Sequence, residues 1–310
     1  MTAAAPPRSS PLHGTPSRRR TEGAIRIVLL VAASLSVAIS VGIIGSLIFE
    51  AAAFVTAIEL GQLVEVGWFP RRGLFDLATV LAGSLIVSAI AMALAAPVGL
   101  ASAVYLSEYA KPRTRKVIKP ILEILAGVPS VVLGFFALTV ISPTLIDPVC
   151  PGATPLFNLA AAGIGVGILI TPLIASIAED AMHAVPNSLR EASYGLGARK
   201  WATSVFVVVP AAVSGIVASL IIGLSRGIGE TMVVAIAAGA VGGSLFSLNP
   251  CQPGQTMTAA MTALATGSDQ VRGASLAFPS LFFIGLLLFG MTLVLNIVSE
   301  RFVRRVRQRY

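Results

Sequence analysis

The sequence predicts an all-α, polytopic membrane protein with six transmembrane helices, and three observations support this prediction. Charged residues make up 12% of the 310 residues, which is about half of their share in a soluble protein. The mean hydropathy is +0.88. Apolar residues gather in runs of about 20 or more, the length needed to cross roughly 30 Å of hydrocarbon. A soluble fold of this size could not cover its surface with so few charges.

Six apolar runs are the candidate spans. The first continues to Phe49 without the small-residue cleavage pattern of a signal peptide, so we expect it to be retained. The fifth is too long for one straight crossing, and we expect it to be long, tilted or broken near Gly227 and Gly229. The runs cover residues 24–49, 78–106, 118–146, 157–178, 205–243 and 277–299.

The basic residues predict how these spans are oriented. The chain has 22 lysines and arginines, of which Arg71, Arg72 and Arg272 fall in predicted outer loops. Arg226 lies inside the fifth run, and the others all fall on the cytoplasmic side of a six-span map. This asymmetry follows the positive-inside rule, so we expect both termini in the cytoplasm. The net charge of +8 therefore indicates orientation rather than nucleic-acid binding.

The N-terminal segment differs from the rest of the chain. Residues 1–23 are rich in Pro, Ser and Arg and have almost no apolar content, which predicts a disordered basic cytoplasmic tail. Residues 24–310 then form the transmembrane domain, with a cytoplasmic segment at 179–206 between the fourth and fifth spans.

The two cysteines lie in similar settings, Asp-Pro-Val-Cys150-Pro-Gly and Asn-Pro-Cys251-Gln-Pro-Gly. Both fall in predicted outer loops, on the oxidising side of the membrane. They are either two unpaired thiols or a disulfide, and their shared side favours the disulfide. A metal site is not expected, because the two histidines, His13 and His183, are both cytoplasmic on this map.

Several kinds of catalytic chemistry are excluded. None of the four lysines follows a glycine, so the chain has no Gly-x-x-x-x-Gly-Lys phosphate loop and is not itself an ATPase. It has no His-Glu-x-x-His pair for zinc hydrolysis. The stretch Gly227-Ile-Gly-Glu230 faintly resembles the Gly-x-Gly-Asp of intramembrane aspartyl proteases, but no aspartate lies in the middle of a span. We therefore predict a non-enzymatic protein that binds no cofactor.

The segment between the fourth and fifth spans predicts a short amphipathic helix. Pro186 suits the first turn of a helix, and Asn187 or Ser188 can cap it. Leu189, Ala192 and Leu196 recur at helical spacing on one face. From these residues alone, the segment is a helix that lies on the membrane surface.

This segment also resembles the EAA loop of ABC-importer permeases, which reads Glu-Ala-Ala, three residues, Gly, nine residues and Ile-x-Leu-Pro. The chain has Glu191-Ala192-Ser193, three residues, Gly197, nine residues and then Val207-Val-Val-Pro210, so every spacing matches. Ser193 and the valines depart from the pattern but conserve size or apolarity. The resemblance implies a coupling helix that docks into an ATPase subunit, with Glu191 as an anchoring carboxylate and Gly197 at the turn.

Two further stretches resemble phosphate-specific permeases. They are Leu122-Glu-Ile-Leu-Ala-Gly-Val-Pro-Ser-Val-Val132 and Gly223-Leu-Ser-Arg-Gly-Ile-Gly-Glu-Thr-Met232. Glu123, the Gly-Glu-Thr-Met ending and Trp68-Phe-Pro70 are more similar to the PstC type than to its paralogue PstA. The resemblance covers residues 24–305.

The resemblance implies a MetI-like permease fold in a bacterial plasma membrane, with inorganic phosphate as the substrate. It also implies three kinds of protein partner: a second, PstA-like permease, two PstB-like P-loop ATPase subunits that bind ATP and Mg²⁺, and a PstS-like extracytoplasmic phosphate-binding protein. It implies no nucleic-acid partner.

Arg226 and Glu230 are the strongest candidates for a substrate path. On a continuous helix their spacing puts them on one face, and Ser219 continues that face. An arginine in the middle of a membrane costs about 2.5–3.5 kcal/mol on insertion scales, so it needs a partner or a polar cavity. The pair either neutralises itself or contacts phosphate, where the guanidinium donates to oxygens and the carboxylate accepts a phosphate hydroxyl proton. Ser130 and Ser84, the latter with Ser88, are weaker candidates for pore lining.

Two other functions remain open. An importer of another oxyanion, such as sulfate or molybdate, would share the EAA-type loop and differ in the two phosphate-type stretches. A passive channel would need no loop that docks an ATPase.

Overall fold

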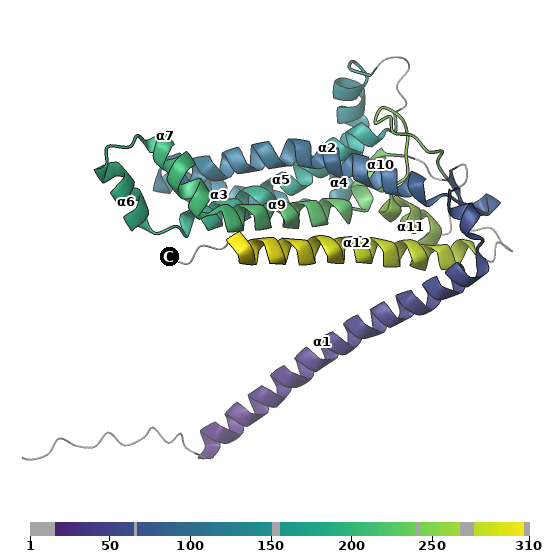
Figure 1. Ribbon diagram of the computed structural model, residues 1–310, viewed down its shortest axis with the longest axis horizontal. Coiled ribbons are helices and arrows are strands. Elements are labelled where there is room, and N and C mark those ends of the chain that lie inside the picture. Colours follow the sequence, from purple (N-terminus) through teal and green to yellow (C-terminus); the bar gives the residue numbers. More distant parts are fainter. Residues whose placement is uncertain (1–15, 65–66, 151–155, 240–241, 267–275, 307–310) are drawn as a thin grey trace, which may run out of the picture. The chain divides into compact units, whose positions relative to one another are not determined.

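The computed structural model describes residues 16–64, 67–150, 156–239, 242–266 and 276–306 (Figure 1). Two compact units divide the described chain, one up to Phe49 and one from Glu50. Among the described residues, four helices are long and apolar enough to cross a membrane, and the number rises to six if each of two bent helix pairs is one span. The predicted all-α membrane fold is confirmed.

The first unit is formed by most of α1 (Pro16–Ala57). Its apolar residues, from Ile25 to Ile48, occur on every face, as is typical of a helix surrounded by apolar material. The helix begins inside the segment that we expected to be a disordered tail, residues 1–23. Arginine and glutamate are good helix formers and proline is favoured in a first turn, so the basic stretch extends the span. Residues 1–15 lie outside the described part of the chain.

The core of the second unit is the packing of α2 (Leu77–Val104) along α5 (Leu159–His183). A Cβ atom at Gly163 would lie 2.7 Å from Cβ of Ile90, and one at Gly167 would lie 3.0 Å from the carbonyl oxygen of Ala91. These two glycines are four residues apart, the small-xxx-small spacing that lets membrane helices approach closely. A π-helical segment, η3 (Tyr105–Tyr109), extends α2.

The third span is bent, whereas we predicted one helix over 118–146. Its first part, α3 (Pro112–Ala126), is amphipathic and has no buried residue. It meets α4 (Ser130–Phe136) at an angle of 86°, and α4 continues as the π-helical η4 (Ala137–Ile146). Pro129 causes the break, because a proline disfavours helical conformation in the residue before it and donates no backbone hydrogen bond.

The fifth run has a bend and a break. A short α7 (Lys200–Thr203), the π-helical η5 (Ser204–Val208) and α8 (Val209–Ala211) meet α9 (Val213–Ile228) at 72°. This bend after Pro210 was not predicted. The break near Gly227 and Gly229 was predicted and is confirmed, because α9 ends at Ile228 and α10 (Met232–Ala237) begins after it.

Two more helices complete the bundle. The sixth span is α12 (Ala277–Val306). Before it lies α11 (Met257–Ala265), in a segment that we expected to be an outer loop. Thr256 caps α11 by accepting a hydrogen bond from the backbone N–H of Ala259 at 3.2 Å. A helix of this length is too short to register as a span, which is why hydropathy missed it.

A small hairpin covers the end of the bundle where α2 begins. Strands β1 (Trp68–Phe69) and β2 (Leu74–Phe75) are antiparallel, and the 3₁₀ turns η1 (Leu60–Val64) and η2 (Pro70–Arg72) precede and join them. The Trp68 backbone also exchanges hydrogen bonds of 2.8 and 2.9 Å with Ser244. Its buried ring packs on Phe75, which packs in turn on Phe54.

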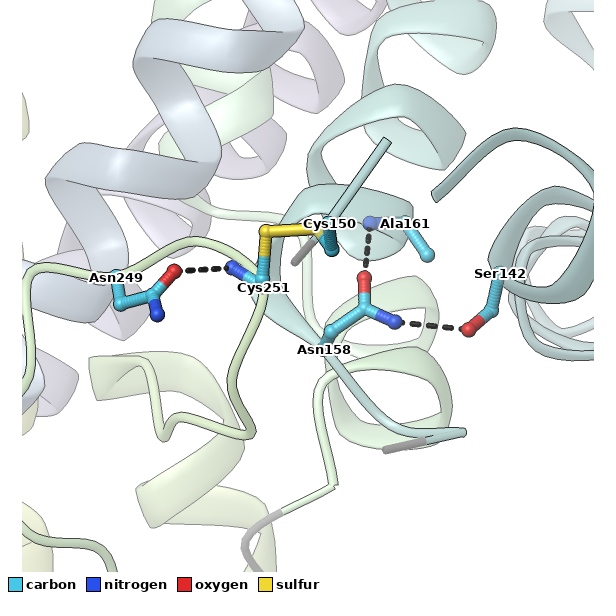
Figure 2. The surroundings of a disulfide bond; sticks show 6 residues. All are labelled: Ser142, Cys150, Asn158, Ala161, Asn249 and Cys251. Atoms are coloured by element: carbon cyan, nitrogen blue, oxygen red, sulfur yellow. Dashed lines mark hydrogen bonds between the residues drawn. A yellow bond between two sulfur atoms is a disulfide. The ribbon is translucent and has the colours of Figure 1, made fainter. Parts of the chain in front are cut away.

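A disulfide joins Cys150, which follows η4, to Cys251 in the loop before α11, with a Cα–Cα distance of 6.0 Å (Figure 2). The same loop caps α5, because the carbonyl oxygens of Pro250 and Gln252 accept hydrogen bonds from the first backbone N–H groups of α5. Asn158 completes this cap. Its amide oxygen accepts from Ala161 and its nitrogen donates to Ser142 (Figure 2). We call this end of the bundle the disulfide end.

We predict that a Cys150→Ser/Cys251→Ser variant will melt at a lower temperature than the native chain. The bridge closes a loop with a sequence separation of 101, for which the chain-entropy model gives a stabilisation of up to about 4.7 kcal/mol. Thermal unfolding in detergent without reductant would measure the difference. Reductant should lower the melting temperature of the native chain and leave that of the serine variant unchanged. Equal melting temperatures without reductant would contradict the prediction.

Candidate functional site

The EAA-type segment forms a helix at the opposite end of the bundle from the disulfide (Figure 1). This helix, α6 (Asn187–Gly195), follows Pro186 and has no fully buried residue. Leu189 and Arg190 are half-buried and pack toward the bundle, whereas Glu191 and Ala192 are exposed. The carboxylate of Glu191, which we expected to anchor an ATPase subunit, is therefore accessible to another chain.

Gly197 turns the chain after α6. Its φ is +80°, in the left-handed region that favours glycine. Its N–H donates to the carbonyl of Tyr194 at 2.9 Å, and the N–H of Ala198 donates to that of Ser193 at 3.1 Å, so the last carbonyls of the helix are satisfied. In the described part of the chain, no atom outside its neighbours lies within 4 Å of where a Cβ would be. Residue 197 is therefore a glycine because of its left-handed backbone conformation, and not because a neighbouring atom excludes a side chain.

Large apolar side chains are exposed around this turn. Leu196 is 90% exposed, Trp201 is 54% exposed and Phe206 is 67% exposed. The rings of Trp201 and Phe206 contact each other edge to face, with 5.8 Å between their centroids. Pro210, the last residue of the EAA-type pattern, is also exposed. Exposed apolar groups next to a polar helix are typical of a surface that another chain or the membrane covers.

Buried charges tie α3 to α5 at the same end. The Glu179 side chain is fully buried, and its carboxylate pairs with Arg115 at 2.6 Å and with Lys119 at 3.0 Å. Lys119 also pairs with Asp180. Lys119 could have paired with Glu123, four residues along α3, but the structure directs it to α5. Sequence spacing could not find this cluster, because its members lie on different spans.

Arg226 and Glu230 do not share a helix face, as we had expected. Helix α9 ends between them, so the spacing of one helical turn does not apply. The Glu230 carboxylate accepts hydrogen bonds from the backbone N–H groups of Met232 and Val233 at 3.2 and 3.4 Å, and so caps α10. Arg226 is exposed and takes part in no ion pair with any described residue. The two side chains therefore do not neutralise each other.

Two of the candidate serines, Ser219 and Ser84, are hydrogen-bonded within the bundle. Ser219 is buried and donates to the carbonyl of Ile216, one turn back, at 2.7 Å. Ser84 is also buried, donates to the carbonyl of Val80, and accepts the backbone N–H of Met257 at 2.9 Å. It joins α2 to the start of α11. Ser130 is half-buried in the first turn of α4.

A groove of about 820 Å³ runs between α2, α9 and α12. Ser88 is the polar side chain in its lining, and its hydroxyl already donates to the carbonyl of Ser84 at 2.7 Å. An apolar groove offers an anion few hydrogen bonds, so this groove is not by itself an anion path. Its other lining residues are Leu81, Leu85, Ala89, Met92, Leu224, Ile228, Leu287, Gly290, Met291, Val294 and Leu295.

The chain is similar to proteins of a known transport family. The family described as "Binding-protein-dependent transport system inner membrane component" matches residues 95–309. The probable ABC transporter permease protein YqgH of Bacillus subtilis is 35% identical over 214 residues, which cover 68% of each chain. The phosphate transport system permease protein PstC of Haemophilus influenzae is 32% identical over 263 residues, 79% of this chain and 81% of that protein.

A solved structure shares the fold. A chain of a bacterial alginate ABC transporter, crystallised with an alginate pentasaccharide-bound periplasmic protein, aligns with a TM-score of 0.62 at 16% identity. The alignment covers 93% of this chain and 98% of that one. At this identity the likeness concerns the fold alone.

We predict that Ser84→Ala will destabilise the protein by about 1–3 kcal/mol. The change leaves the buried N–H of Met257 without its acceptor, and an unsatisfied buried donor costs about that much. Ser280→Ala is the matched control, because Ser280 is equally buried but its hydroxyl bonds to its own helix, at the carbonyl of Ala277. Thermal unfolding of both variants in detergent would measure the difference. Equal melting temperatures would show that Ser84 does not hold α11.

Proposed function

The chain belongs to the family of binding-protein-dependent transport system inner membrane components, and from that premise we propose that it is the permease subunit of an ATP-driven phosphate importer. Subunits of this family are membrane permeases without catalytic activity of their own. The observation that carries the choice of phosphate is the 32% identity to a phosphate permease over most of both chains.

The exposed Arg226 supports a role in the phosphate path. A guanidinium at the end of a membrane helix, without an ion-pair partner among the described residues, can offer several N–H donors to phosphate oxygens. The Glu230 carboxylate is held in place because its Oε1 atom caps α10, and no described residue donates to Oε2. That oxygen can accept the proton of a phosphate hydroxyl, a group that sulfate lacks at neutral pH.

In this proposal Ser84 supports the path indirectly, because its hydroxyl joins α2 to the start of α11, whereas Ser219 is bonded within α9 and Ser130 lies in the first turn of α4. The apolar groove of this chain offers an anion few hydrogen bonds, so the path is completed by a second, homologous permease.

The exposed face of α6 supports coupling to ATPase subunits. Glu191 and Ala192 face away from the bundle, and Gly197 and Pro210 complete the EAA-type pattern around the exposed apolar side chains. Two P-loop ATPase subunits would bind here and supply the ATP and Mg²⁺. The α6 end would then be cytoplasmic, together with both termini, and an extracytoplasmic phosphate-binding protein would meet the disulfide end.

We predict that proteoliposomes holding the chain with its second permease and ATPase subunits will take up radiolabelled phosphate, with binding protein supplied on the disulfide side. Arg226→Lys should lower this uptake sharply, because lysine keeps the charge but loses the planar fork of donors. Glu230→Gln should retain partial phosphate uptake and admit some sulfate, because with the amide oxygen capping α10 the amide nitrogen donates to an oxyanion oxygen and no longer requires a phosphate hydroxyl proton.

Arg113→Lys is the matched control for Arg226→Lys, since Arg113 is an exposed arginine on α3, outside the proposed path. Uptake of sulfate or molybdate in preference to phosphate by the unmodified complex would make the chain a permease for another oxyanion. Uptake without ATP would make it a channel.

We also predict that Glu191→Ala will abolish ATP-dependent uptake and weaken copurification of the ATPase subunits, while the chain still inserts in the membrane. The loss of this side chain should leave the fold intact, because it is exposed and forms no ion pair with any described residue. Ser188→Ala, at another exposed position of the helix, is a control for changes in α6 as such. Full uptake by the Glu191→Ala complex would leave α6 as a helix that lies on the membrane surface.

A further inference from the structure

Arg190, the residue before Glu191, points into the bundle and uses every donor of its guanidinium. Its Nη2 and Nε atoms donate to the two carboxylate oxygens of Glu108, at 2.9 and 3.3 Å. The second Nη2 donor bonds to the carbonyl of Met182 at 2.8 Å. The two Nη1 donors bond to the carbonyl of Val185 at 2.6 Å and to Oδ1 of Asn187 at 3.3 Å. A guanidinium has five N–H donors, and all five are used.

These bonds join three parts of the chain at one point. Glu108 lies in η3, the extension of α2, and Met182 lies in the last turn of α5. Val185 is in the turn after α5, and Arg190 itself is in α6. The positive guanidinium also meets the carbonyls at the C-terminal end of α5, where the helix dipole favours a cation. Arg190 is thus bonded to the ends of both core helices.

The surroundings make this contact rigid. The side chain of Arg190 is 14% exposed and that of Glu108 is 4% exposed, so water competes little for the paired charges. Two parallel N–H to oxygen bonds fix both the distance and the orientation of the pair. The described ion pair of Arg304 with Glu300 is very different, with both side chains more than half exposed on a single helix. Such surface pairs contribute little.

We propose that Arg190 is a positioning residue that makes α6 move as one rigid body with α2 and α5. Its neighbour Glu191 faces the ATPase subunit in the proposed function, on which this inference rests. A displacement of α6 by that subunit then reaches α2 and α5 through the hydrogen bonds of Arg190 to Glu108 and to the carbonyl of Met182. Without them, the turn at residues 184–186 would flex and absorb the displacement.

Two measurements test this role in the complex with its ATPase subunits. Spin labels at Ser188→Cys on α6 and Ala101→Cys on α2, both exposed, report the distance between these helices. The native cysteines are bonded to each other and do not take a label. We expect a narrow distance distribution for the native Arg190 and a broad one for Arg190→Ala. The number of ATP molecules hydrolysed per phosphate imported should rise several-fold in Arg190→Ala.

Arg190→Lys keeps the charge but has three donors, so both readouts should lie between those of the native and alanine forms. Arg304→Ala is the control and should match the native form. A purely structural role would reduce assembly and leave the ATP-to-phosphate ratio of the assembled complexes unchanged.

A narrow distribution and an unchanged ratio in Arg190→Ala would overturn the proposal. If that variant does not assemble, Glu108→Gln decides in its place, because it weakens the pair and leaves the carbonyl bonds of Arg190. The distance measurement does not depend on the cargo. Failure of the native complex to import phosphate would therefore refute the proposed function alone, and the distances would still decide the role of Arg190.

Discussion

The close approach of α2 and α5 is the constraint on which the rest of the second unit depends. In a membrane, apolar side chains gain little by leaving lipid for protein, so helices associate by tight packing of small residues. Gly163 and Gly167 provide that packing against α2, and Gly223 lets α9 approach Ile174 of α5 in the same way. The helices that carry candidate functional residues are thus arranged around a rigid pair.

At the α6 end, the ion pairs form around buried carboxylates and join residues that are far apart in the sequence. Glu179 is fully buried yet meets two cations from α3, and Glu108 is nearly buried yet meets Arg190. A buried carboxylate is strongly unfavourable unless it is paired and hydrogen-bonded. Glu179, on α5, therefore restricts where α3 can lie. Glu108, on the extension of α2, restricts where α6 can lie.

Hydropathy predicted the straight spans well, because a long apolar run has one stable arrangement in lipid. The run 78–106 became α2 with η3, and 157–178 became α5. It did not predict the bends after Gly127 and Pro210, since an apolar run continues through both. The four-residue spacing of Arg226 and Glu230 predicted a shared face only for a helix that continues past Gly229, and α9 ends at Ile228. The partners of Arg190 were hidden because two are backbone carbonyls and a third is far along the chain.

The disulfide has a consequence for how the subunit can open. Cys150 follows the third span and Cys251 precedes α11, and both are joined to the capped start of α5. A covalent bond at that point removes one internal hinge: these segments cannot separate from each other while the bridge is intact. An opening at this end therefore cannot occur between the two bridged segments, which move as one unit.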